Sequence, residues 1–261
     1  MVDNILEVRD LKVWFPVKKG VFGRTTGYVK AVDGVSFVMR RGETLGVVGE
    51  SGSGKTTVVR VIAGLQRPTG GSFEVAGRVA MVFQDPLGSL NPRMTVRATL
   101  EEAIDCATSS VRNASLASTA SPASPARTAS GLLSLVGLDD SALDKYPHEF
   151  SGGQRQRVCI ARAIATDPEL LICDEAVSAL DLSIRAQVLE LLTGLKEKLG
   201  LSLLFITHDL GVVQHIADRI LVMNRGKTIE EGPCGQVLKA PREEYTRFLM
   251  ASVPKIGKPL T

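Results

Sequence analysis

Short runs of apolar residues alternate along the chain with segments in which apolar residues recur at helical spacing. The runs TLGVV, VAMVF, ELLIC and SLLFI are each bounded by polar or turn residues. Continuous apolar runs of this length are typical of strands that are buried on both faces. Helical spacing separates them, for example in residues 56–65. The pattern therefore predicts an α/β fold with a mainly parallel sheet.

The first forty residues follow a different pattern, in which apolar and polar residues alternate. The segments LEVRDLKVWF and VKAVDGVSFVM both show it, and a Gly- and Lys-rich turn region lies between them. Alternation with a period of two is typical of strands with one buried face. We therefore expect an N-terminal antiparallel β subdomain beside the parallel sheet.

Residues 95–150 are predicted to form an inserted, mainly helical subdomain. Within it, residues 107–130 are rich in Ser, Ala and Thr and contain Pro122 and Pro125, which predicts a mobile surface excursion. A pair of Ala-rich helices is the alternative, because Ala favours helix. The whole chain, residues 1–261, is interpreted as one domain with a core at 1–94 and 151–235, the helical subdomain, and a C-terminal extension at 236–261.

Composition narrows the possible partners only slightly. Hydrophobic residues make up 44% of the 261 and charged residues 23%, which suits a globular core. The formal charge of +3 gives no reason to expect nucleic acid. The four cysteines form no CxxC pair, which argues against zinc and a disulfide framework. No apolar run is long enough to span a bilayer and no signal-peptide pattern is seen, so membrane association would require a partner.

A phosphate-binding loop follows the TLGVV run. The pattern G-x4-G-K-[ST] is met at every fixed position, so backbone N–H groups and the start of the next helix are expected to cradle phosphates. Lys55 would bridge the β and γ oxygens of ATP and the Thr56 hydroxyl would ligate Mg²⁺. A Gly-rich turn before a helix is the alternative, and the dinucleotide pattern G-x-G-x-x-G fails at Thr57. The predicted nucleotide-binding residues are Gly49, Glu50, Ser51, Gly52, Ser53, Gly54, Lys55, Thr56 and Thr57.

Two adjacent carboxylates end the ELLIC run. Asp174 would lie at the edge of the sheet, where it can hold Mg²⁺ through water. Glu175 beside it can polarise the attacking water as general base. The pair suggests hydrolysis of the nucleotide, although an acidic pair after a strand is often only the start of a solvated loop.

Two more strands end in polar residues that could join this site. VAMVF runs into Gln84, and SLLFI runs through Thr207 into His208. Because the carboxyl ends of parallel strands meet at one edge of a sheet, we expect both side chains near the γ-phosphate, with Gln84 also as a magnesium ligand. A structural role is the alternative for His208.

A second anion-binding helix start is predicted at Ser151, Gly152, Gly153 and Gln154, which open a helix continuing RQRVCIARAIA. Two phosphate cradles facing one nucleotide within a monomer would be redundant. A head-to-tail dimer would instead let this segment of one subunit close over the ATP bound by the other.

With these motifs in order, the chain resembles an ABC transporter ATPase with a P-loop NTPase core over residues 5 to 253. The resemblance makes residues 49–56 the Walker A loop, Gln84 the Q-loop, residues 151–154 the signature and Asp174 with Glu175 Walker B. It makes residues 178–181, which end in Asp181, the D-loop and His208 the switch histidine. By the same likeness Phe15 stacks on adenine. Trp14 and Tyr28 are the other aromatic candidates, and core packing is the alternative role for Phe15.

Within that family VFQDPLGSLNPRMTV, YPHEFSGGQRQRV and EEYTRFLMASVP are most similar to ATPases of oligopeptide, dipeptide and nickel importers. The likeness implies ATP and Mg²⁺, integral membrane permease subunits, a second ABC ATPase and, indirectly, a substrate-binding protein. The ATPase pair could be a homodimer or a heterodimer, and the likeness favours a heterodimer. The protein would lie at the cytoplasmic face of the membrane, peripheral through the permease, which residues 84–94 would contact.

Four features depart from the family pattern, one of them the Ser- and Ala-rich tract at residues 107–130, where family members have clear helices. Ala176 stands where Pro usually follows the Walker B Glu, the link LQRPTGGSFEVAGRVAMVFQ looks shortened, and the C-terminal cysteine cluster of many relatives is missing beyond Cys234. The short link puts the antiparallel edge in question, and we predict no iron–sulfur site. A soluble ATPase of this family acting as a scaffold or assembly factor is the alternative function. DNA-repair ATPases of the family insert long coiled coils, which this chain lacks.

Overall fold

The computed structural model describes residues 3–19, 24–113 and 128–252. The chain divides into two compact units. The first comprises Met1–Ala76 and Leu204–Thr261, and the second comprises Gly77–Leu203. The two units are described separately below, and the predicted division into core, helical subdomain and C-terminal extension stays a prediction.

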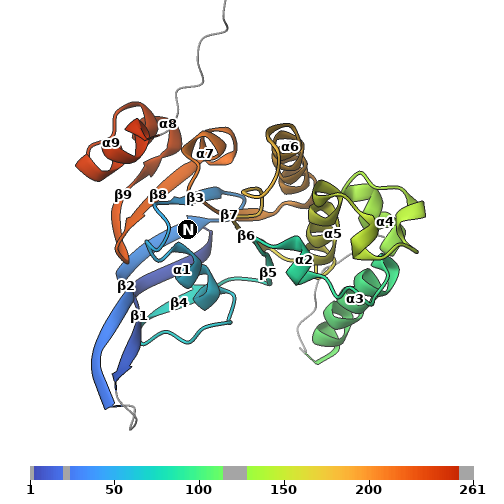
Figure 1. The fold of residues 1–261 in the computed structure, drawn as a ribbon, viewed down its shortest axis with the longest axis horizontal. Coiled ribbons are helices and arrows are strands. Elements are labelled where there is room, and N and C mark those ends of the chain that lie inside the picture. The colour runs from blue at the N-terminus through green and yellow to red at the C-terminus, as the bar shows by residue number, and fades with distance from the viewer. Residues whose placement is uncertain (1–2, 20–23, 114–127, 253–261) are drawn as a thin grey trace, which may run out of the picture. The chain divides into compact units, whose positions relative to one another are not determined.

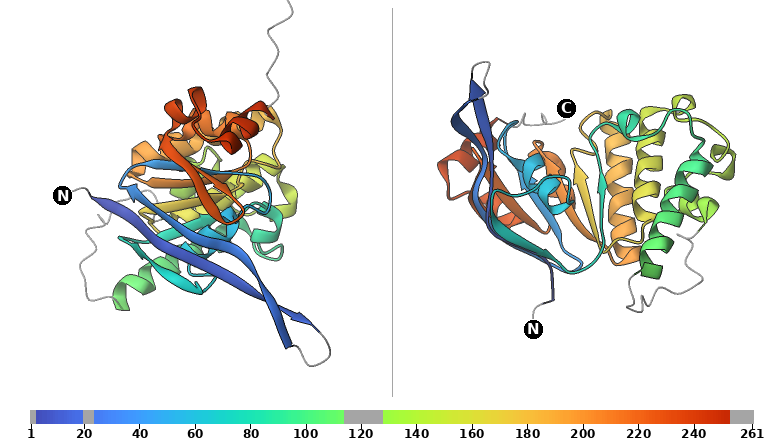
Figure 2. Two further views of the ribbon diagram at one scale, coloured as in Figure 1. Left: turned by 90° about the vertical axis from the view of Figure 1, so that its left-hand side faces the viewer. Right: turned by 90° about the horizontal axis from the view of Figure 1, so that it is seen from below.

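The first unit contains an antiparallel sheet of three strands in the order β2-β1-β4. Strand β1 (Asn4–Lys19) and strand β2 (Arg24–Arg40) form a long twisted ribbon (Figure 2). Strand β4 (Gly70–Val75) pairs with the other edge of β1. The alternating N-terminal segments therefore form the predicted strands, and the antiparallel edge is complete despite the short link that follows the phosphate loop.

The same unit contains a second group of strands that places the phosphate loop. Strand β3 (Thr44–Val48) pairs in parallel with β8 (Arg219–Asn224), and β8 pairs antiparallel with β9 (Lys227–Pro233). On its other edge β3 adjoins β7 (Ser202–Thr207), most of which belongs to this unit. The helices are α1 (Lys55–Ile62), α7 (Leu210–Ile216), α8 (Cys234–Lys239) and α9 (Glu244–Ala251) (Figure 1).

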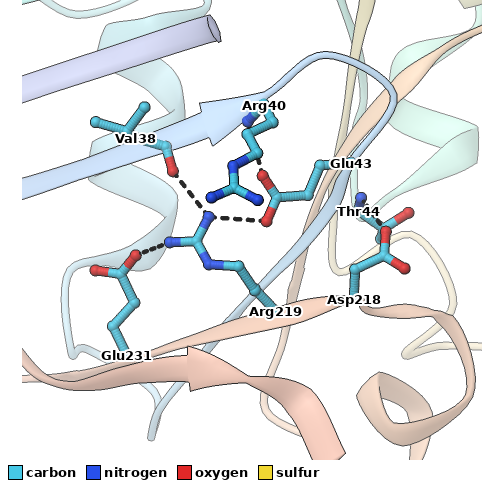
Figure 3. Close-up of polar contacts among 7 residues, drawn as sticks. All are labelled: Val38, Arg40, Glu43, Thr44, Asp218, Arg219 and Glu231. Carbon is cyan, nitrogen blue, oxygen red and sulfur yellow. Dashed lines mark hydrogen bonds and ion pairs between the residues drawn. The ribbon is translucent and has the colours of Figure 1, made fainter. Parts of the chain in front are cut away.

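A partly buried ion network joins the strands of the first unit. The Arg219 guanidinium donates to Glu43 Oε1 at 2.8 Å and to the Val38 carbonyl at 3.1 Å, and it also pairs with Glu231 (Figure 3). Glu43 in turn accepts the Arg40 N–H at 2.7 Å. Since each partner belongs to β2, β8, β9 or the turn before β3, one cation connects these strands, and its removal would leave the buried Glu43 carboxylate without this ion pair.

The second unit combines two parallel strands with helices. Strand β5 (Val79–Val82) pairs with β6 (Leu170–Asp174). The α-helices are α2 (Pro86–Ser89), α3 (Val96–Asn113), α4 (Ala129–Leu135), α5 (Gly152–Ile164) and α6 (Leu182–Leu199), with 3-10 turns at Asp140–Ala142 and Pro147–Glu149. Apolar side chains from α3, α4 and α5 are fully buried, including Leu100, Leu132, Leu133 and Ile160.

The prediction of a surface excursion over residues 107–130 is wrong at both ends. Residues 107–113 continue helix α3, and α4 begins at Ala129 after the Thr128 hydroxyl accepts the Gly131 N–H at 3.0 Å. Leu100 and Ala103 are buried on α3, and once such a face has started the helix, each further residue adds a backbone hydrogen bond, so the helix continues despite the Ser and Thr content of residues 107–113. Residues 114–127 lie outside the described part of the chain.

All four continuous apolar runs are strands, so the α/β prediction is confirmed. The buried runs TLGVV and ELLIC coincide with β3 and β6 to within one residue. None of the helices in the described part of the chain is both long enough and apolar enough to cross a bilayer.

Candidate functional site

The phosphate loop leaves β3 through glycines that no other residue can replace without strain. Gly49 has φ 153°, and a Cβ there would lie 2.1 Å from the Met223 carbonyl oxygen. Gly54 has φ 104°, and a Cβ there would lie 2.3 Å from the Ala31 carbonyl oxygen. Both contacts are far inside van der Waals distance, so the two glycines let the loop pack directly on the backbone of neighbouring segments.

Lys55 fixes the inside of this loop. Its ammonium donates to the Gly49 carbonyl at 2.7 Å, to the Glu50 carbonyl at 2.8 Å and to Ser53 Oγ at 3.3 Å. The side chain is almost fully buried. A buried ammonium needs oxygen partners, and phosphate oxygens have the same hydrogen-bonding chemistry as these carbonyl and hydroxyl oxygens.

The loop residues differ in their exposure to solvent. Gly54 is the N-cap of α1, and Thr56 and Thr57 lie half-buried in the first turn of that helix. Ser51 and Gly52 are exposed, and a Cβ on Gly52 would meet open space within 4 Å. The loop therefore has one closely packed side and one side open to solvent, as a phosphate cradle requires.

In the second unit the structure brings two predicted catalytic residues together. Gln84 Nε2 donates to Glu175 Oε2 at 3.2 Å. Glu175 directly follows β6 with φ 49°, and Asp174 ends that strand as a buried carboxylate. A positive φ at a residue other than glycine is strained and is common at functional sites. Burial raises the pKa of the neighbouring Cys173 thiol to about 12, with a further contribution from the Asp174 charge.

The signature segment begins helix α5 with a capping box. Ser151 Oγ accepts the Gln154 N–H at 3.4 Å, and Gln154 Oε1 accepts the Ser151 N–H at 3.0 Å. Gly153 is buried, and a Cβ there would lie 2.5 Å from Ile184 of α6. Ser151, Gly152 and Gln154 are exposed, so the helix start predicted to bind an anion is open to solvent.

The D-loop connects Walker B to helix α6. Ser178 Oγ donates to the Glu175 carbonyl at 2.9 Å, which ties this loop to the proposed base. Asp181 is the N-cap residue of α6 and is exposed. No hydrogen bond from its side chain caps the helix.

The other two predicted residues lie in the first unit. His208 directly follows β7 and is exposed, while Asp209 after it caps α7 by accepting the Gly211 N–H at 2.9 Å. Phe15 is 41% exposed on β1 opposite Val29. Trp14 instead donates its indole N–H to Asp33 at 3.1 Å and lies under the Lys30 ammonium. Trp14 therefore interacts with two neighbouring side chains, whereas the Phe15 side chain is partly open to solvent.

Two features of the site were not found from the sequence. The Tyr245 hydroxyl of α9 accepts the backbone N–H of Glu50 in the phosphate loop at 3.3 Å. In the second unit, a cavity of about 170 Å³ is lined by Gln84, Arg155, Gln156 and Ala176 among others. The amide of Gln156 is fully buried and has no hydrogen-bond partner within the described residues. Sequence similarity marked the segments around these residues but assigned no role to Tyr245 or Gln156.

Comparison with known proteins places these motifs in a family. A profile described as ABC transporter matches residues 32–178. The chain is 43% identical to the probable D,D-dipeptide transport ATP-binding protein DdpF of Escherichia coli (strain K12), over 100% of this chain and 82% of that protein. It is 45% identical to the oligopeptide transport ATP-binding protein AppF of Bacillus subtilis (strain 168), over 98% of this chain and 80% of that protein.

Solved structures agree on the fold. The structure of cbiO1 from Clostridium perfringens, part of the ABC transporter complex cbiONQ, superposes with a TM-score of 0.71 at 24% identity and covers 97% of both chains. At that identity the likeness concerns the fold, and the fold is that of an ATP-binding cassette. By its sequence, its fold and its phosphate loop, the chain belongs to the ABC transporter family.

Proposed function

We propose that this chain is the ATP-hydrolysing subunit of an importer that takes up peptides or a related small solute. The observation that supports this most directly is identity of more than 40% along the whole chain with peptide transport ATP-binding proteins. The segment at residues 84–94 is part of that likeness. A scaffold protein would have no use for a segment that contacts permeases, and nothing in the described residues favours that alternative.

The phosphate loop is proposed to bind the phosphates of ATP. The residues proposed to bind it are Gly49 through Thr57, whose loop has one closely packed and one open side. Lys55 would exchange its loop carbonyls for β- and γ-phosphate oxygens at little desolvation cost, since it is already buried and fully bonded. Phe15, exposed on β1, is the proposed platform for adenine.

The residues proposed for Mg²⁺ suit this ion chemically. Mg²⁺ prefers oxygen ligands, and Thr56, Gln84 and Asp174 offer a hydroxyl, an amide and a carboxylate. Gln84 uses its amide nitrogen toward Glu175, which leaves its amide oxygen as the atom to ligate the metal. When bound, the ion would neutralise charge that develops on the phosphates.

Glu175 is the proposed general base. Its carboxylate would take a proton from the water that attacks the γ-phosphate, and the hydrogen bond from Gln84 would hold it in place. His208, exposed after β7, would contact the γ-phosphate as hydrolysis proceeds. These three residues are the proposed catalytic groups.

A second ATPase would complete each site. Ser151, Gly152, Gly153 and Gln154 present an exposed helix start, and they would close over ATP bound by the partner together with Asp181. The partner ATPase would be a second copy or a similar chain. Integral membrane permease subunits would hold both at the cytoplasmic face of the membrane and receive cargo from a substrate-binding protein.

Two experiments test the proposal, one of ATP binding and one of assembly with membrane proteins. Purified protein with Mg²⁺ is titrated with a fluorescent ATP analogue beside Lys55→Ala, and we expect saturable binding only for the unsubstituted chain. The tagged chain is also recovered from detergent-solubilised membranes of cells that express it. Co-purification of multi-span membrane proteins is expected. Absence of ATP binding would refute the ATPase, and recovery only in a membrane-free complex would refute the importer.

A further inference from the structure

Helix α9 reaches the phosphate loop from the C-terminal part of the first unit. The Tyr245 hydroxyl accepts the backbone N–H of Glu50, the second residue of the loop, at 3.3 Å. The two residues are 195 positions apart. Glu50 is exposed, whereas the tyrosine ring is half-buried. Burial raises the pKa of the Tyr245 hydroxyl, although the bond from Glu50 N–H opposes the shift, so the hydroxyl stays neutral at physiological pH.

The same helix packs against an apolar cluster that includes the last residue of the strand leading into the loop. Tyr245, Leu249 and Met250 lie against an apolar cluster that includes Val48, the last residue of β3, and Val222 of β8. The phosphate loop begins with Gly49, the residue directly after Val48. The helix therefore shares an apolar cluster with the residue that precedes the loop, and it makes a hydrogen bond to the second residue of the loop.

Glu230 on β9 fixes where α9 begins. Its carboxylate, which is largely buried, accepts the Arg242 N–H at 2.9 Å and the Glu243 N–H at 3.2 Å. Burial opposes the charge, but these backbone N–H groups prevail and lower the pKa of Glu230. An anion at a helix start is the favourable arrangement. Since Tyr245 lies two residues beyond Glu243, the position of its hydroxyl follows from this anchor.

We infer that Tyr245 is a positioning residue for nucleotide binding, because its hydroxyl holds the first turn of the phosphate loop in the shape that receives ATP. Glu230 acts through it by fixing the start of α9. The inference rests on the proposed ATPase function and adds a residue from outside the motifs that define the site. One backbone hydrogen bond is at stake, so the effect should fall on ATP affinity and leave the chemical step unchanged.

Tyr245→Phe tests the inference because it removes only the hydroxyl and keeps the ring packed. We expect KM for ATP and the dissociation constant of a fluorescent ATP analogue to rise about threefold to tenfold, with kcat unchanged within about twofold. Tyr146→Phe in the second unit is the matched control, since it removes the same atom far from the loop in sequence, and it should leave both constants unchanged.

A double substitution separates positioning from general stability. Glu230→Gln should raise KM in the unsubstituted chain, lower its melting temperature, and have no further effect on KM in the Tyr245→Phe background. If Tyr245→Phe binds ATP as tightly as the unsubstituted chain, the inference is wrong. It is also wrong if the KM effects of the two substitutions multiply. Failure of the unsubstituted chain to bind ATP would instead refute the proposed function.

Discussion

Gln84 donates its side-chain amide N–H to Glu175 Oε2 across 3.2 Å. The two residues come from segments 91 positions apart, and their pairing joins the Q-loop to the proposed base. A conformational change that displaces Gln84 would remove one hydrogen bond that orients this carboxylate. Hydrolysis would then depend on the position of the Q-loop, which in the proposed transporter lies next to the permease.

The first prediction concerns the base itself. Glu175→Gln keeps a side chain that can pair with Gln84 but cannot accept the proton of the attacking water. We expect kcat for ATP hydrolysis to fall by at least about 100-fold while ATP still binds and the closed dimer accumulates. Phosphate release and size-exclusion chromatography with ATP measure both effects. Glu190→Gln on the exposed side of α6 is the control, and normal turnover in Glu175→Gln would exclude the role of this residue.

The second prediction concerns the close packing of the phosphate loop. Gly54→Ala places a Cβ 2.3 Å from a backbone oxygen at φ 104°. We expect a loss of about 2–4 kcal/mol in the free energy of unfolding together with loss of ATP binding. Gly64→Ala has φ 73° but meets nothing within 4 Å, so it should cost only about 1 kcal/mol. Equal effects in urea unfolding would mean that the backbone contact is unimportant.

The third prediction separates the two roles of Ser151. Ser151→Ala removes the cap of α5 and should lower the free energy of unfolding by about 1 kcal/mol. Ser151→Asp keeps an oxygen acceptor for the Gln154 N–H, so stability should be retained. Its negative charge would nevertheless repel the phosphates of ATP held by the partner, and ATP-dependent dimerisation and turnover should fall in both variants. Full activity in Ser151→Asp would argue against a phosphate at this helix start.

The fourth prediction concerns the thiols. Burial raises the pKa of Cys159 to about 11 and of Cys173 to about 12, and it also raises the pKa of Cys234. At pH 8 roughly one thiol in a thousand is a thiolate at a pKa near 11. Cys106 is exposed, so a thiol reagent should modify it rapidly in the native protein and all four cysteines only after denaturation. Cys106→Ser should abolish the fast phase.

The same pKa shifts give a direction for stability. A thiol whose pKa is raised on folding favours the native state below the unfolded pKa and loses that contribution as pH rises through the folded value. The free energy of unfolding should therefore decrease as pH rises above about 9, the ordinary thiol value. Urea titrations between pH 7 and pH 10 measure this, and a slope that is unchanged in Cys173→Ala would assign it to other groups.

Sequence reasoning succeeded where one local pattern determines the structure. The run TLGVV is buried at every position of β3, and a strand covered on both faces has few alternatives. The capping box of α5 likewise depends on residues three positions apart. Both features could be predicted from neighbouring residues. The backbone N–H groups that the glycine-rich loop would offer to phosphate could be predicted in the same way.

Reasoning from sequence failed where the cause lies elsewhere in the chain. Residues 107–113 are helical because α3 begins upstream on a buried face, whereas their own composition of Ser and Thr favours a loop. Tyr245 contacts the phosphate loop only after β8, β9 and α9 have packed together. For Gln84 and Glu175 the sequence predicted only that both lie at the same edge of the sheet. It did not predict their hydrogen bond, because no periodicity specifies a bond between two side chains.

The C-terminal half of helix α5 makes two hydrogen bonds to the short helix α2, which follows Gln84. Cys159 Sγ donates to the Pro86 carbonyl at 3.7 Å, and the Arg162 guanidinium donates to the Ser89 carbonyl. The helix begins at Gly152, and the predicted signature residue Ser151 is its N-cap. A displacement of residues 86–89 would thus act directly on α5, whose N-cap serine is the residue proposed to meet the partner's ATP.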